Sequence, residues 1–151
     1  MRNMKLSTFT ASLLCCVALL AIPAAGAFAA DPIPIEVFLL AGQSNMAGRA
    51  PASGLPTSPV NLQLPQDDVL FYYGSSLTTL RPGSGTDFGP EVTFGRTVAD
   101  ALPEETFALI KYGNSGTSLA VDWDPAGGSS YNTFMSKVSA GLAALVSAGY
   151  D

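Results

Sequence analysis

Ser44 lies in a short polar turn whose residue types suit acyl-transfer chemistry. Gln43 and Asn45 flank it, and Gly42 and Gly48 bound the turn. Glycine permits tight backbone turns. A serine at the end of a strand can present its hydroxyl where neighbouring N–H groups converge, which is the arrangement that stabilises an oxyanion. Ser44 is therefore a candidate nucleophile, and the alternative is that it only caps a helix within a polar turn.

A nucleophilic serine needs a base, and the sequence contains no histidine. A serine hydroxyl is a weak nucleophile at neutral pH until a neighbouring group takes its proton. Lys111 is one alternative base, in a Ser-Lys pair, but such a lysine must be desolvated and Lys111 could equally be an exposed cation at a strand end. Met46 stands where a Gly-x-Ser-x-Gly elbow has its second glycine, so the α/β-hydrolase fold is not indicated.

The elements that would position these residues follow an α/β pattern. Apolar, β-branched and aromatic runs predict strands over residues 35–40, 69–73 and 106–112. The first run is largely apolar, so we expect it to be the first central strand of a sheet, buried on both faces. Apolar residues at helical spacing predict helices that begin near Pro90 and Asn132. This order is typical of an open α/β sheet with parallel strands and right-handed crossovers.

Polar residues concentrate in the loops after the first and third predicted strands, which open on the same carboxyl edge of the sheet, where ligands gather. Glu91 either orients the nucleophile turn or favours the start of its helix. Trp123 either forms a wall that stacks on a sugar or closes an edge of the core with its N–H satisfied. Gln43 and Asn45 either hydrogen-bond substrate or brace the turn. These residues complete the candidate site.

Three segments in series resemble the sialate O-acetylesterase and acetylxylan esterase group, the SASA-domain relatives of the SGNH hydrolases. They are residues 42–46, residues 89–91 with 94–96, and residues 111–125. The resemblance implies a flavodoxin-like three-layer α/β sandwich with a parallel sheet. It also implies hydrolysis of acetyl esters on carbohydrates such as sialic acid or xylan-type glycans, with Ser44 attacking the acetyl carbonyl.

The resemblance further implies that the N–H of Ser44, with groups near Asn114 and Gly116, holds the oxyanion. Ser115 stands where the group usually has a glycine, so the donor there stays open. The family supplies its base and orienting acid from an Asp-x-x-His segment near its C-terminus. This sequence has no histidine and stops after one helix beyond the third segment. We therefore expect residues 30–151 to be the truncated N-terminal part of an esterase domain, nearly inactive alone.

Two other functions stay open at this stage. One is an inactive gene fragment. The other is a non-catalytic carbohydrate-binding module, in which Trp123, Tyr72 and Tyr73 hold a sugar without chemistry. Turnover of an aryl acetate that depends on Ser44 distinguishes the esterase from both.

Residues 1–29 have the three-part layout of a secretory signal, with Arg2 and Lys5 ahead of an apolar stretch and small residues at its end. Cleavage after Ala29 fits best and would deliver a secreted or periplasmic protein. The most apolar run is short for a bilayer-spanning helix and contains Pro23. We therefore expect no stable membrane anchor.

Composition excludes several classes of partner and cofactor. Cys15 and Cys16 are the two cysteines of the sequence and both lie in the signal, so the mature chain can form neither a disulfide nor a Cys-based metal site. We expect no metal and no cofactor. Seven basic residues face twelve acidic ones, and the basic residues are scattered singly, which argues against nucleic acid. An acetylated carbohydrate, neutral or weakly charged, is the expected partner.

Overall fold

Four strands form the central sheet of the protein, in the spatial order β1–β6–β3–β4. The computed structural model describes residues 31–82 and 87–151, within one compact unit, Asp31–Asp151. The predicted signal peptide, residues 1–29, lies outside the described residues. The strands are β1 (Glu36–Gly42), β3 (Gln66–Tyr73), β4 (Ser76–Leu80) and β6 (Phe107–Gly113). β1, β6 and β3 run parallel, and β4 pairs antiparallel with β3.

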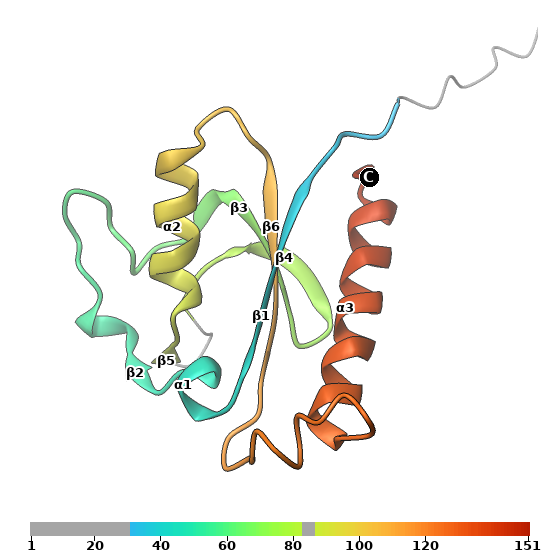
Figure 1. Cartoon of the computed structure of the whole chain (residues 1–151). Helices are drawn as coiled ribbons and strands as arrows, with labels where there is room; N and C mark the ends of the chain where they lie inside the picture. Colours follow the sequence, from blue (N-terminus) through green and yellow to red (C-terminus); the bar gives the residue numbers. More distant parts are fainter. Residues whose placement is uncertain (1–30, 83–86) are drawn as a thin grey trace, which may run out of the picture. The chain divides into compact units, whose positions relative to one another are not determined.

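One long helix covers each face of this sheet, α2 (Glu91–Ala101) on one side and α3 (Ser129–Ser147) on the other (Figure 1). The core on the α2 side consists of Val69, Phe71, Leu80, Ala99, Phe107 and Leu109. The core on the α3 side consists of Tyr72, Ile110 and Val138. The helix–sheet–helix layers confirm the predicted flavodoxin-like α/β sandwich with a mostly parallel sheet.

Glycines let both helices approach the sheet closely. A Cβ on Gly95 of α2 would lie 2.4 Å from Leu80 Cδ2, and one on Gly141 of α3 would lie 2.7 Å from Ile110 Cδ1. Such short separations are incompatible with close packing, so a larger side chain at either position would have to displace the core side chain it meets or the helix itself. The two glycines therefore allow each helix to pack closely against the side chains of the sheet.

The prediction that the first strand is central and buried on both faces is wrong. β1 pairs with β6 along its whole length, and among the described strands it lies at the edge of the sheet. Leu39 is consequently 49% exposed, whereas Ile110, its register partner on β6, is fully buried. An apolar run predicts that a strand packs against apolar side chains. It does not show whether a further strand pairs with each of its two edges, and the prediction failed for this reason.

Short elements surround the carboxyl end of β1. They are α1 (Ser44–Ala47), β2 (Ala50–Pro51), the 3₁₀ turn η1 (Ala52–Gly54) and β5 (Asp87–Phe88). β2 and β5 pair antiparallel, and the chain after η1 is anchored where Leu55 and Leu62 pack against Val92 of α2. The long connection between β1 and β3 therefore has a small core of its own. β4, which follows a tight turn after β3, was not predicted.

The two ends of the described unit meet at one side of the sheet. Ile33 and Tyr150 form a parallel bridge, in which Asp151 N donates to Ile33 O at 2.9 Å and Ile35 N donates to Asp151 O at 3.0 Å. Glu36 N instead donates to Thr106 O, next to β6. The segment around Tyr150 therefore lies on the side of the chain opposite to β6. In the part of the chain that is described, no helix is both long and apolar enough to span a bilayer.

Candidate active site

Ser44 begins α1 directly after the carboxyl end of β1. Gln43 is the N-cap of this helix, and its Oε1 accepts hydrogen bonds from Ser44 N at 3.3 Å and from Ser44 Oγ at 2.9 Å. Ser44 is half-buried, while Gln43 and Asn45 are exposed. The hydroxyl is thus oriented by a neutral amide oxygen, which holds it in place but is too weak a base to remove its proton.

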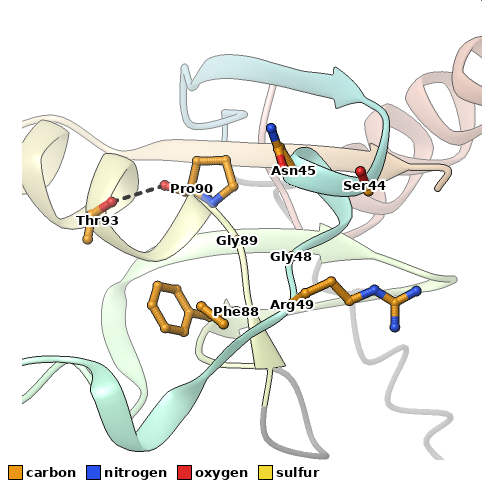
Figure 2. A pocket seen from close by; sticks show the side chains of 9 residues that line it. Ser44, Asn45, Gly48, Arg49, Phe88, Gly89, Pro90 and Thr93 are labelled. Atoms are coloured by element: carbon orange, nitrogen blue, oxygen red, sulfur yellow. Dashed lines mark hydrogen bonds between the residues drawn. The ribbon is translucent and has the colours of Figure 1, made fainter. Parts of the chain in front are cut away.

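A cavity of about 400 Å³ opens beside Ser44 (Figure 2). We call it the serine pocket, and its lining includes Ser44, Asn45, Arg49, Phe88, Gly89, Pro90 and Thr93. These residues come from α1, from the residues between α1 and β2, and from the end of β5, the start of α2 and the two residues that join them (Figure 2). Arg49 donates to Ser115 Oγ at 3.5 Å, so its guanidinium links this pocket to the loop after β6.

A second, more apolar cavity of about 500 Å³ lies next to Gln43, the residue before Ser44. We call it the aromatic pocket, and its lining includes Gln43, Thr117, Leu119, Trp123, Tyr131 and Phe134. Trp123 is half-buried, and its Nε1 donates to Thr117 Oγ1 at 2.9 Å. Its indole N–H is therefore satisfied while its ring lines a cavity, and the predicted stacking on a sugar stays a prediction.

A buried ion pair lies next to the turn that carries Ser44. Lys111 Nζ is 2.5 Å from Glu91 Oε2, and the two side chains are only 2% and 4% exposed. Burial lowers the pKa of Lys111, and the hydrogen bond and charge of Glu91 oppose that shift. Lys111 Nζ also donates to Ala47 O at 3.2 Å. Its hydrogen bonds in the described chain thus go to Glu91 and Ala47 rather than to Ser44, which disfavours a Ser-Lys mechanism.

Two other residues of the predicted site lie outside both pockets. Asn114 N donates to Gly42 O at 2.9 Å, and its side-chain Nδ2 donates to the buried Ser130 Oγ at 3.0 Å. Gly116 has φ of +75°, a left-handed conformation that favours glycine. Glu91 is equally absent from the pocket linings, because it is buried against Lys111. Their predicted contact with an oxyanion or substrate stays a prediction.

The sequence reasoning missed the backbone contacts that seat α1. A Cβ on Gly113, the last residue of β6, would lie 2.4 Å from Ala47 N, and one on Gly48 would lie 2.4 Å from Gly89 N. Gly48 also has φ of +89°. The glycines around the ends of β1 and β6 were visible in the sequence, but which backbone each would touch was not. The sequence indicates Lys111 only as an alternative base or an exposed cation, since no local pattern pairs it with Glu91.

Comparisons with known proteins bear on the family and on the fold of this chain. The family of carbohydrate esterases described as sialic acid-specific acetylesterases (SASA) matches residues 34–148. A protein of Arabidopsis thaliana with a known X-ray structure shares the fold, with a TM-score of 0.56 and 20% sequence identity. That similarity covers 73% of this chain and 52% of the Arabidopsis chain, so this chain spans about half the length of that relative. No curated protein matches the chain.

The family match extends over most of the chain and includes the Ser44 turn, the serine pocket and the loop that carries Trp123. β1 ends beside β6, with Gly42 opposite Gly113, and both pockets take lining residues from the end of β1 or from the turn that follows it. The protein therefore belongs to the SASA family of carbohydrate esterases.

Proposed function

We propose that this protein is a serine esterase that removes O-acetyl groups from carbohydrates, with Ser44 as its nucleophile. The observation that carries the proposal is the position of Ser44, half-buried at the carboxyl end of a parallel strand and on the wall of a cavity of about 400 Å³. Such edges of open α/β sheets are where ligands bind. Membership of a carbohydrate esterase family supports the reaction class.

In this reaction Ser44 Oγ forms a bond to the acetyl carbonyl carbon, and the sugar oxygen leaves with a proton. Water then attacks the acetyl-enzyme and releases acetate, which restores Ser44. Backbone N–H groups at the start of α1 would stabilise the oxyanion. The proton of Ser44 must go to a base. The resemblance to the esterase family implies an imidazole in this role, and the sequence contains no histidine.

The two pockets suggest how an acetylated sugar would lie. The serine pocket contains the nucleophile together with Asn45 and Arg49, whereas the aromatic pocket presents Trp123, Tyr131 and Phe134. Aromatic rings offer flat apolar surfaces with polar rims, which suit the faces of a sugar ring. We propose that the glycan contacts the aromatic pocket while its acetyl group reaches Ser44. The leader-like residues 1–29 support export as the location of this activity.

The test is acetylation of Ser44 by an aryl acetate, with and without imidazole in solution. Imidazole supplies the base that the sequence lacks, so it should accelerate formation of an acetyl adduct, which peptide mapping by mass spectrometry should place on Ser44. Ser44→Ala should abolish this adduct, and Ser53→Ala, at an exposed serine of η1, should leave it unchanged. Equal labelling of wild type and Ser44→Ala would reject the nucleophile assignment.

The aromatic pocket also supports a second candidate, a carbohydrate-binding module without chemistry. A module would bind acetylated and deacetylated glycans by the same aromatic contacts, and Trp123→Ala would abolish binding. Calorimetric binding to both glycans, combined with an unmodified Ser44 after exposure to aryl acetate and imidazole, would favour this candidate over the esterase.

A further inference from the structure

We propose that Glu91 and Lys111 form a positioning pair that holds α1, and therefore Ser44, in the orientation that acyl transfer requires. The inference rests on the proposed function of Ser44. Neither residue lines the serine pocket or the aromatic pocket. Both act through the backbone, so they are positioning residues and not catalytic ones.

The hydrogen bonds of the pair connect two walls of the serine pocket. On one side Lys111 Nζ donates to the carbonyl oxygen of Ala47, the last residue of α1, at 3.2 Å. On the other side Glu91 Oε1 accepts from the N–H of Gly89 at 3.1 Å, and Gly89 itself lines the pocket. The short Lys111–Glu91 contact of 2.5 Å joins the two sides. One ion pair therefore sets the position of the nucleophile helix relative to the opposite wall.

Close backbone contacts leave little freedom around this connection. A Cβ on Gly113 would come within 2.4 Å of Ala47 N, and a Cβ on Gly48 would come equally close to Gly89 N. Gly89 is packed in the same way, since a Cβ there would come within 2.9 Å of Met46 O. Any shift of α1 therefore either collides with these segments or breaks the bond from Lys111 to Ala47.

Stability alone is a weak reason for this pair. Burying two charges is costly, and well-packed apolar residues in place of a buried ion pair are often neutral or stabilising. Apolar packing is non-directional, whereas hydrogen bonds weaken steeply when their angle or distance changes. A cation that donates to the carbonyl at the end of the nucleophile helix supplies this directional constraint. Tyr73, whose ring centroid is 5.1 Å from Lys111 Nζ, provides a further favourable contact for the cation.

The double variant Lys111→Met/Glu91→Gln tests the proposal in the whole chain. The introduced glutamine would keep an oxygen for Gly89 N–H, while both charges and the bond to Ala47 are lost. Hydrogen exchange should become at least about 10-fold faster at the amides of Ala47 and Gly48, which close the turns of α1, with α3 unchanged. Acetylation of Ser44 in the presence of imidazole should slow by on the order of 100-fold, the cost of a displaced nucleophile.

Glu91→Gln alone is the second variant, and because Lys111 can still donate to Ala47 O in it, it should change both readouts less but in the same direction. Asp68→Asn, at an exposed ion pair with Arg96, is the control and should change neither. Unchanged exchange in α1 together with unchanged Ser44 reactivity would overturn the proposal. Equal acceleration of exchange in α1 and α3 would also overturn it, because the pair would then act only on global stability. Absence of a Ser44 adduct in wild type would reject the esterase function, while the exchange data would still test the pair.

Discussion

β1 and β6 are neighbouring parallel strands of the same length, yet they meet different environments. Leu39 on β1 and Ile110 on β6 are register partners, but the first is 49% exposed and the second fully buried. β6 also carries the buried cation of the sheet, Lys111, whereas β1 leads into the half-buried Ser44. Ser44, the proposed nucleophile, thus follows an edge strand. Lys111, which is proposed to hold Ser44 in position, lies on the buried strand beside it.

If this division holds, the largest loss of stability should come from Lys111. Lys111→Met leaves the carboxylate of Glu91 buried without its cation, which costs about 3–5 kcal/mol in comparable buried pairs. The free energy of unfolding from urea denaturation measures the loss. The double variant Lys111→Met/Glu91→Gln should recover most of it. A single variant as stable as wild type would show that β6 does not provide this support.

The next effect tests the apolar part of the buried strand. Ile110→Ala should destabilise the fold by about 2–5 kcal/mol, because it leaves a cavity between Tyr72, Val138 and the close approach of Gly141. Urea denaturation under the same conditions provides the measurement. Ile110→Val, which removes a single methylene, serves as the graded control and should cost only about 0.5–1.5 kcal/mol.

The ion pair between Asp68 of β3 and Arg96 of α2 tests whether the exposure of an ion pair sets the free-energy cost of breaking it. The hydrogen bond from Arg96 lowers the pKa of Asp68 below its ordinary 3.8, so this carboxylate stabilises the fold above that pH and loses its contribution as the pH falls through the lowered value. Asp68 is 53% exposed, and water screens the pair, so Asp68→Asn should cost less than about 1 kcal/mol at neutral pH. The acid side of a stability–pH curve should flatten correspondingly in the variant.

The smallest effect is expected at the edge strand. Leu39→Thr should change the free energy of unfolding by no more than about 0.5 kcal/mol, since Leu39 is largely exposed and threonine suits a strand. The measurement is again urea denaturation, beside Ile110→Ala at the paired position. A loss as large as that of Ile110→Ala would mean that the outer side of β1 is covered in solution.

The sequence predicts where the strands and helices lie along the chain better than it predicts which strands pair with each other. Periodicity predicted β1, β3, β6 and the two long helices, because each has a run of apolar residues at strand or helix spacing. The predicted cap Asn132 was wrong, since α3 begins three residues earlier, at Ser129, with Gly128 as its N-cap. The hairpin strand β4 was missed because Ser76, Thr78 and Thr79 lie in a stretch that is otherwise typical of a loop. The edge position of β1 depends on which strands pair, and strand pairing is decided by tertiary contacts that a local pattern does not contain.

The residues of the candidate site divide in the same way, into those that a local pattern predicts and those that meet only in the folded chain. The turn that holds Ser44 and its flanking amides could be predicted, since it is contiguous in sequence and follows a strand. The Glu91–Lys111 pair could not, because its members are separated by a helix and a strand and meet only after α2 packs on the sheet. From the sequence, Glu91 was a residue that either orients the turn or starts a helix. Its burial beside Lys111 supports the first role.

The bridge between Ile33 and Tyr150 shows that the segment at the C-terminal residue runs parallel to the chain that enters β1. Ile33 and Ile35 pair with the segment at Asp151, and the backbone groups of Val37, which follow in the same alternation, face the same side. Because the pairing is parallel, any polypeptide joined to Asp151, including a purification tag, would leave the domain alongside β1 and heading toward Ser44. A label at Asp151 itself would lie beside Ile35, at the opposite end of β1 from Ser44, and a bulky fusion there would cover the outer edge of β1.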